Sequence, residues 1–355
     1  MTKLEPGVAY AFENRASHLR LHRCNDTWLN QDDGGTAPDD IDHQWLFFPA
    51  DDDGSWWWIV NRNSGGLLYA DGWGEPGKDA RLASSPHDMG LETYKWQFVP
   101  TSDGYGHLKN MQRNTYLHIR GGEAGFKVNM DVDHSDGFTE WKPVVMARFP
   151  EVAAARPVPE RPDYGDIDRL TGYQAPAERT PTKLLGTVAV PFFVVHDGSQ
   201  DPGWKARETP YYFLERHSSW TRTGYKEYTG KAEFTETLTT EVGLVSHNAN
   251  EVEEKLSISV SAEAGFSYAG ASAKVSTTIS SSLRVKRSSS EQKSSTKTVK
   301  EEVKIKQNRV SIALWYRKDT YRLTRANGDE VVKWDVIDPV TCVVDSYPQD
   351  GAQRF

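Results

Sequence analysis

The sequence predicts an all-β protein with two antiparallel units, the first built from short strands and the second from long ones. Three features of the 355 residues lead to this prediction: a threefold repeat within the first 150, long runs of strand-forming residues beyond 183, and the lack of an amphipathic helical pattern of any length. Between the two units, residues 150–182 contain six prolines and no apolar periodicity. We therefore expect a linker there.

Tryptophans mark the repeat in the first unit. Trp45, Trp96 and Trp141 recur at spacings of 51 and 45 residues. A second element recurs in phase with them, as Asn-Arg-x-Ser at 14–17 and 61–64 and as Gln-Arg-Asn-Thr at 112–115, with leucines 49 residues apart at Leu19, Leu68 and Leu117. Short repeats that cannot bury their own apolar faces predict one closed domain with threefold pseudosymmetry.

The repeat resembles the ricin-B-like β-trefoil, whose three lobes each end in Gln-x-Trp. In this chain His43, Tyr94 and Thr139 stand in place of the glutamines. The resemblance implies that residues 1–149 are a β-trefoil that binds carbohydrate, with a galactose-type sugar on a glycolipid or glycoprotein as the receptor.

Sugar contacts are predicted where the first two lobes carry Asp-x-Trp, because an aromatic ring stacks on a sugar while carboxylates and amides bond its hydroxyls. The predicted contacts are Asp26, Trp28, Asn30, Asp71, Trp73 and Glu75. Either Trp could instead be a packing residue. The third lobe has Gly121-Gly122-Glu123 at this place and no Trp, so no third site is predicted there. Of the three tryptophans at 56–58, at least one must point outward, as a sugar platform or as a membrane anchor.

Long strand-forming runs follow the linker, at 184–197, 211–216, 225–245 and 297–325. The last run leads to Asn327-Gly328, a typical hairpin turn. These runs predict an elongated antiparallel unit over residues 183–355.

Residues 256–286 alternate apolar and small polar side chains, which is the periodicity of a strand. Folding back about 269–270 would place residue 268 opposite 271 and gather the apolar side chains on one face. Each arm has 13 residues, and a tilted strand needs roughly 9 to 11 to cross a bilayer. The sequence thus predicts a membrane-insertion hairpin, and an ordinary two-sided hairpin of a soluble sheet is the alternative.

In that hairpin the predicted membrane-facing side chains are Leu256, Ile258, Val260, Phe266, Tyr268, Val275, Ile279 and Leu283. The predicted lumen-facing side chains are Glu263, Lys274, Arg284 and Lys286. One hairpin cannot close a barrel, so several copies of the chain must each contribute one, which makes the pore a homo-oligomer.

The second unit resembles the Tpp insecticidal toxins, the family of the mosquito-active binary toxin components. The resemblance is carried by Gly186 to Asp197, Tyr211 to Glu215, Tyr321 to Glu330, and Val336 to Pro348. It implies an aerolysin-like pore-forming domain behind the trefoil head. It further implies storage as an intracellular crystal in a sporulating bacterium, proteolytic trimming, receptor binding on insect gut cells and a β-barrel pore in the target membrane. Some relatives act as two components, so a second toxin component is a possible partner in pore formation.

Composition argues against nucleic-acid binding, secretion by a signal peptide and a disulfide-bonded fold. Up to Pro150 there are 14 Lys and Arg against 22 Asp and Glu, a poor match for nucleic-acid phosphates. The N-terminal residues lack the apolar core of a secretory signal, so we expect any release from the cell to follow another route, such as lysis. Cys24 and Cys342 fall in different predicted domains and are expected to be free thiols.

Enzymatic activity, a cofactor and a metal site are not expected. The second unit has no alternating strands and helices, no His-Glu-x-x-His and no Gly-x-Ser-x-Gly. The competing function class is a galactose-type lectin or adhesin whose second domain never inserts into a membrane.

Overall fold

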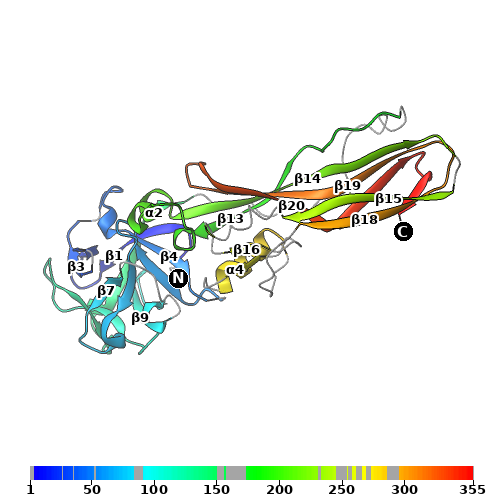
Figure 1. Cartoon of the computed structure of the whole chain (residues 1–355). Coiled ribbons are helices and arrows are strands. Elements are labelled where there is room, and N and C mark those ends of the chain that lie inside the picture. The colour runs from blue at the N-terminus through cyan, green and yellow to red at the C-terminus, as the bar shows by residue number, and fades with distance from the viewer. Residues whose placement is uncertain are drawn as a thin grey trace. The chain divides into compact units, whose positions relative to one another are not determined.

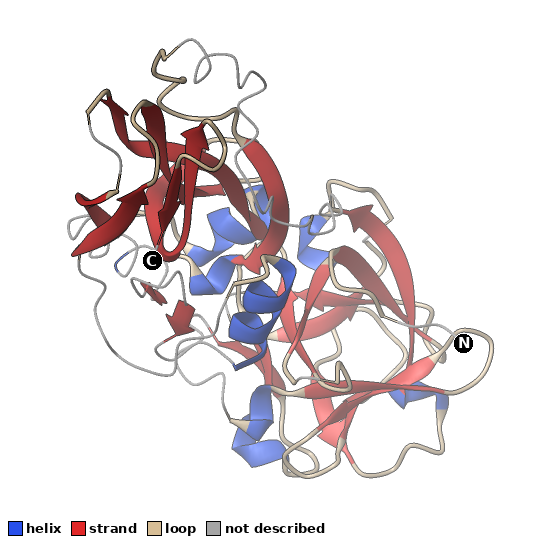
Figure 2. Cartoon of the chain, turned by 90° about the vertical axis from the view of Figure 1, so that its right-hand side faces the viewer, coloured by secondary structure: helices blue, strands red, loops and turns tan. Residues whose placement is uncertain are grey.

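The computed structural model describes residues 4–25, 27–34, 36–51, 53–83, 91–149, 156, 173–230, 233–244, 254, 258–260, 266–268, 273–285 and 296–354. Strands dominate these residues and the helices are short (Figure 2). The chain divides into two compact units. The first comprises residues 1–151, 190–212 and 272–274, and the second comprises 152–189, 213–271 and 275–355. Linker boundaries at 150 and 182 remain a prediction.

Among the described residues the head contains twelve short strands, four in each lobe. Figure 1 shows this part of the chain in blue to cyan. The first lobe contains β1 (Val8–Asn14), β2 (Arg20–Arg23), β3 (Leu29–Asp32) and β4 (Trp45–Pro49). The second contains β5 (Trp57–Asn61), β6 (Leu67–Ala70), β7 (Ala80–Ala83) and β8 (Trp96–Pro100). The third contains β9 (Gly106–Asn110), β10 (Tyr116–Ile119), β11 (Val128–Asp131) and β12 (Glu140–Arg148). The predicted β-trefoil is confirmed.

Short 3-10 turns precede the fourth strand of each lobe: η1 (Ile41–His43), η3 (Glu92–Tyr94) and η4 (Gly137–Thr139). Isolated bridges join the lobes where β3, β7 and β11 approach each other, pairing Trp28 with Arg81, Asn30 with Lys127 and Asp79 with Asn129. The three lobes therefore close on one another instead of leaving strand edges open at this place.

The repeated tryptophans are core residues of the head. Trp45, Trp96 and Trp141 are fully buried. Their indole Nε1 groups donate to equivalent backbone carbonyls, at 3.2 Å to Leu21, 3.0 Å to Leu68 and 2.9 Å to Leu117. Since a buried indole N–H needs an acceptor, the repeat maintains one hydrogen bond per lobe.

This hydrogen bond corrects the predicted alignment of the repeat. The leucine of the first lobe is Leu21 and not Leu19. The asparagine of the third lobe is Asn110 and not Gln112, because Asn14, Asn61 and Asn110 each donate to the turn before the fourth strand of a lobe. A slip of two residues keeps every side chain on the same face of a strand, so periodicity alone could not detect it.

Residues 190–212 complete the outer surface of the head. They form the turn η5 (Phe192–Val194) and the helix α2 (Pro202–Glu208), which Asp201 caps by accepting from the Trp204 amide. The Phe193 ring contacts the rings of Phe48 and Trp58, with centroids 5.0 and 5.7 Å apart.

Trp58 is therefore neither a sugar platform nor a membrane anchor. It points away from the head core, yet only 3% of it is exposed because the Phe193 ring packs against it. Trp56, just before β5, is only partly buried, so a role as sugar platform or membrane anchor remains a prediction for that residue. Trp57 points to the opposite side of the strand, into the head core.

The second unit is built on a seven-stranded antiparallel sheet in the order β13-β14-β19-β20-β15-β18-β21 (Figure 1). Its strands are β13 (Lys183–Pro191), β14 (Tyr211–Tyr228), β15 (Phe234–Leu244), β18 (Lys297–Ile305), β19 (Val310–Thr324), β20 (Glu330–Tyr347) and β21 (Ala352–Arg354). The predicted run 225–245 contains the end of β14 and all of β15, and the run 297–325 contains β18 and β19. The predicted turn at Asn327-Gly328 is present, with Gly328 at a φ of 90°.

Strand β19 is buried on both faces. Leu314 and Tyr316 pack with Leu238 of β15 and Val303 of β18 in one apolar cluster. Trp315 points to the other face, with Trp220 of β14. The ribbon of β15 and β18 thus covers one face of the long strands, which explains why its own sequence is apolar on only one side.

No helix among the described residues is long and apolar enough to span a membrane.

Candidate functional sites

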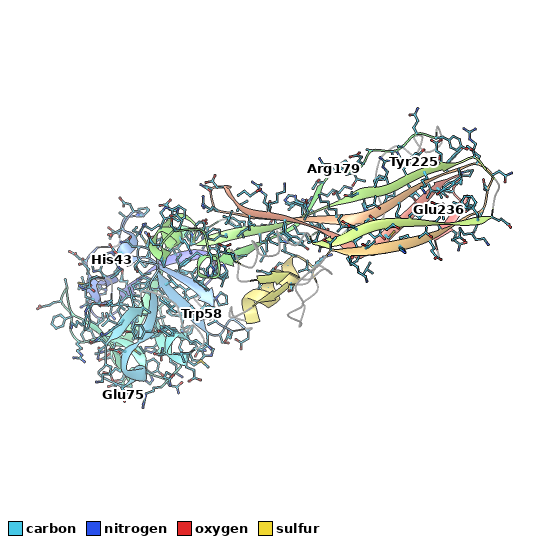
Figure 3. All side chains as sticks on the ribbon, in the orientation of Figure 1. His43, Trp58, Glu75, Arg179, Tyr225 and Glu236 are labelled. Atoms are coloured by element: carbon cyan, nitrogen blue, oxygen red, sulfur yellow. The ribbon has the colours of Figure 1, made fainter. Side chains whose placement is uncertain are left out.

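A polar cluster lies on the first lobe, next to the hairpin of β2 and β3. His22 pairs across the hairpin with Asn30, and their side chains are hydrogen-bonded at 2.8 Å. The His22 ring stacks on the His43 ring, with centroids 4.5 Å apart. His43 Nδ1 lies 3.2 Å from the carboxylate of Asp40 (Figure 3). These groups present donors, acceptors and an aromatic face within one small area.

The third lobe repeats this arrangement. His118 pairs across β10 and β11 with Asn129, and their side chains are hydrogen-bonded at 2.9 Å. Asp131 and Asp136 lie 3.9 and 4.0 Å from the His118 ring nitrogens. The ring of Phe138, on η4, lies 6.3 Å from that of His118. We call the groups of His22, Asn30 and Asp32 and of His118, Asn129 and Asp131 the His-Asn-Asp sets.

A signal for these sets exists in the sequence but was missed by the search for Asp-x-Trp. Strand β3 reads Leu-Asn-Gln-Asp and strand β11 reads Val-Asn-Met-Asp. The second lobe departs from the pattern, because β7 reads Ala-Arg-Leu-Ala and Arg81 stands where the asparagines do. Its hairpin carries Tyr69, whose ring contacts Tyr94 at 5.5 Å.

Burial and hydrogen bonding set the protonation states of the first-lobe cluster. Desolvation, together with the neighbouring His22, lowers the pKa of His43, so that ring is neutral at and above neutral pH. The backbone amide of Gly34 donates to Asp32 and lowers the pKa of that carboxyl. The cluster therefore combines a neutral imidazole with an ionised carboxylate.

The predicted sugar contacts fall in three different surroundings. Trp28 and Asp71 lie together, because Arg81 stands 4.2 Å from the Trp28 ring centroid and pairs with Asp71 at 3.0 Å. Lys127 also stands over the Trp28 ring, 3.8 Å from its centroid. Two cations over one indole compete with a sugar for its faces.

The remaining predicted contacts are separate from that cluster. Asn30 belongs to the first His-Asn-Asp set. Glu75 is exposed, with Arg113 3.7 Å away (Figure 3). Asp26 and the side chain of Trp73 lie outside the described residues.

The described residues of the predicted hairpin at 256–286 are 258–260, 266–268 and 273–285, and they differ from the predicted pairing. Strands β16 (Ile258–Val260) and β17 (Phe266–Tyr268) pair with each other, Ile258 opposite Tyr268. Their pairing is centred on position 263, not on 269–270. Residues of the predicted second arm form the helix α4 (Ala273–Ser282), so the prediction of a strand there is wrong for this state.

Spacing explains how the same residues fit a helix. Val275, Ile279 and Leu283 are four residues apart, so they share one face of a helix and equally one face of a strand. Ile279 and Leu283 are buried, with exposures of 0% and 1%. Their burial satisfies the apolar side chains without a strand partner.

Of the four predicted lumen-facing residues, the structure describes Lys274 and Arg284. Lys274 lies in α4, and Arg284 is exposed just beyond it in a left-handed backbone conformation, at a φ of 51°. Glu263 and Lys286 lie outside the described residues, as does Leu256 of the predicted membrane-facing set. Within the part of the chain that the structure describes, no group of three His, Cys, Asp or Glu side chains could hold a metal ion.

Comparison with known proteins identifies the long-stranded part. A model of the family described as insecticidal crystal toxin, P42, matches residues 183–349. Those residues belong to the insecticidal crystal toxin family. The resemblance to Tpp toxins is thereby confirmed. No curated protein sequence matches the chain.

The fold of the whole chain is similar to that of a solved structure. The crystal structure of Cry35Ab1 is 17% identical, and the match covers 98% of this chain and 91% of that one, with a TM-score of 0.73. This similarity confirms the predicted architecture of a trefoil head and an aerolysin-like long-stranded module.

Two matches concern the head alone. A designed threefold-symmetric protein, ThreeFoil, is 19% identical over 38% of this chain and 97% of its own, with a TM-score of 0.34. A ricin B-like lectin from Macrolepiota procera in complex with lactose is 14% identical over 40% and 98%, with a TM-score of 0.33. Neither carries a conclusion about what this chain binds.

Proposed function

We propose that this insecticidal toxin binds glycans on target gut cells through its trefoil head, oligomerises, and inserts residues 256–286 into the membrane as a β-hairpin. One observation carries the proposal. A segment with a strand-like alternation of apolar and polar residues is stored as the helix α4 and two short strands, with Ile279 and Leu283 covered. An exposed ribbon of this kind would expose a contiguous apolar face and aggregate.

Conversion from helix to strand keeps the apolar residues on one side, since their spacing of four suits both structures. The polar side is mostly Ser and Thr, which are tolerated facing water and facing neighbouring protein. In a membrane every backbone group must be paired, so the hairpin is stable there only when neighbouring copies complete a barrel. Oligomerisation and insertion are therefore parts of the same step.

An environment-sensitive fluorophore can test the conversion residue by residue. Cys24 and Cys342 would first be replaced by Ser, and single cysteines then placed in turn at 274 to 283 and labelled with NBD. After addition of liposomes we expect emission to rise at every second position, following Val275, Ile279 and Leu283. A rise with a period of 3.6 residues, or no rise while the protein is bound, would contradict insertion as a hairpin.

The predicted lumen residues have their own test. Lys274→Glu reverses a charge on the polar side of the hairpin, so it should move the reversal potential of channels in planar bilayers toward greater cation preference. A matched change, Thr278→Glu, places a new charge on the same side. An unchanged reversal potential in both variants would remove these residues from the lumen.

Glycan binding is proposed for two alternative sets of residues. The His-Asn-Asp sets offer hydrogen-bonding groups on lobes 1 and 3, which suits recognition of sugar hydroxyls. The predicted contacts Asp26, Trp28, Asn30, Asp71, Trp73 and Glu75 remain the second set. A glycan array with the whole toxin would compare His22→Ala and His118→Ala with Trp28→Ala and Trp73→Ala. We expect the His variants to lose binding to galactose-type glycans more strongly than the Trp variants do.

Dye release separates this function from the lectin class. Liposomes made with gut glycolipids should bind the toxin and leak, whereas a lectin or adhesin would bind without leakage. Release by the purified toxin alone would also show that no second component is needed for pore formation. Storage as an intracellular crystal and trimming by gut proteases remain part of the proposal.

A further inference from the structure

We propose that Arg216 is a latch that holds the insertion segment in its stored conformation by binding the backbone at the end of α4. The inference rests on the proposed function, because a latch is useful only for a segment that later moves. Its evidence is independent of that function, however, since it comes from contacts in the stored state.

The side chain of Arg216 binds backbone carbonyl groups of the segment. One of its terminal nitrogens donates to the carbonyl oxygens of Leu283 and Arg284, at 2.7 and 2.9 Å. These two residues directly follow α4, where the helix closes with hydrogen bonds from Leu283 to Ile279 and from Val285 to Ser280. A cation at this end is favoured, because the last carbonyls of a helix lack partners and carry partial negative charge.

The same guanidinium is anchored in the long-stranded sheet. Its other two nitrogens donate to one carboxylate oxygen of Asp319, at 3.2 and 2.6 Å. Arg216 is on β14 and Asp319 on the adjacent strand β19, and they are only 2% and 1% exposed. An ion pair buried so deeply is rigid, so it fixes the point to which the end of α4 is bound.

The surroundings keep Arg216 charged. Burial by itself lowers its pKa, but Tyr321, Asp319 and the more distant Asp338 outweigh burial and raise the pKa above the usual value. Arg317, the other cation beside Asp319, pairs chiefly with Asp338. Arg216 therefore stays protonated and keeps its N–H donors for the two carbonyls.

The arrangement also permits release. When the segment leaves, Arg216 loses two bonds to neutral carbonyls but keeps its bonds to Asp319, so no unpaired charge is left in the sheet. Both lost bonds are to the backbone of adjacent residues. Conversion of α4 to a strand therefore breaks them together, which makes release an all-or-none event.

Hydrogen exchange in the soluble toxin tests the latch. The variant Arg216→Lys retains the charge for Asp319 but cannot reach two carbonyls and a carboxylate with the same fork. We expect amides of residues 279–285 to exchange at least tenfold faster than in the wild type. The control Arg317→Lys alters the same ion network without touching α4 and should leave their exchange unchanged. Equal protection in Arg216→Lys and the wild type would overturn the latch, as would an equal loss of protection in both variants.

A second variant tests the latch if Arg216→Lys does not fold. Arg216→Met combined with Asp319→Leu removes both charges, so no unpaired ion is buried, and it should show the same loss of protection. The latch is wrong if this double variant folds with residues 279–285 fully protected.

Leakage from glycolipid liposomes then relates the latch to activity. We expect Arg216→Lys to release dye at least threefold faster than the wild type. If the wild type causes no leakage, the proposed pore function fails, while the exchange comparison still decides whether Arg216 holds α4. Faster exchange with an unchanged leakage rate would overturn the role of the latch in pore formation.

Discussion

The ring of Trp58 meets the ring of Phe193 edge to face, with centroids 5.7 Å apart. Trp58 lies on β5 of the trefoil, whereas Phe193 lies within the residues matched by the toxin family model. Part of the family-matched sequence is thus structurally part of the head. A head cut at residue 149 would expose the apolar side of β4 and β5.

Truncating the neighbouring phenylalanine should destabilise the head strongly. Phe192 is buried and its ring lies 6.0 Å from that of Phe48. We expect Phe192→Ala to lower the free energy of unfolding by about 3 kcal/mol through lost burial and a cavity. Urea unfolding of the full chain, followed by circular dichroism, measures this. Phe126→Ala, at a residue that is 40% exposed, is the control and should cost under about 1 kcal/mol.

Residues 190–212 pack closely on the head at Gly65, so we expect a side chain at this position to destabilise the protein. Gly65 has a φ of 68°, and a methyl group there would collide with the carbonyl of Pro202. We expect Gly65→Ala to cost about 2 to 4 kcal/mol, from backbone strain and overpacking together. Gly7 has a φ of 78° with open space around it, so Gly7→Ala should show the backbone strain alone, about 1 kcal/mol. Equal costs would mean that the contact with Pro202 does not matter.

The repeated indole hydrogen bonds predict similar costs in all three lobes. Trp45→Phe, Trp96→Phe and Trp141→Phe each leave a buried carbonyl without its donor, at Leu21, Leu68 and Leu117 respectively. We expect a loss of about 1 to 3 kcal/mol for each variant by urea unfolding. A variant with no loss would show that the indole hydrogen bond does not contribute to stability in that lobe.

Alkaline pH should weaken the long-stranded unit through Tyr228. Burial, and next the charge of Glu236, raises the pKa of Tyr228 to about 12. The unfolded chain releases this proton near pH 10, so the stabilisation is complete below about pH 10 and is lost as pH rises toward 12. Tyr228→Phe should therefore make the thermal unfolding temperature fall less steeply across this window. A slope that Tyr228→Phe leaves unaltered would refute the prediction.

Local patterns in the sequence determined the broad architecture. Each lobe carries a Trp and a Leu at similar but not identical intervals, so three repeats could be recognised without contacts although the first-lobe leucine was misaligned by two residues. The long strands and the Asn327-Gly328 turn were predictable for the same reason, because strand alternation and turn chemistry are encoded by neighbouring residues. The Leu-Asn-Gln-Asp and Val-Asn-Met-Asp strands were equally visible but gained meaning only when His22 and His118 were found opposite them.

Tertiary structure alone decided what periodicity leaves ambiguous. A shift of two residues preserves the face of a strand, so the hydrogen bond that Trp45 donates to the Leu21 carbonyl, like those of its equivalents, was needed to establish that Leu21 belongs to the repeat. Residues four apart share a face in both a helix and a strand, so the pattern of Ile279 and Leu283 could not exclude α4. The helix forms because contacts distant in sequence, among them those of Arg216 with the carbonyls beyond it, contribute free energy that alternation does not report.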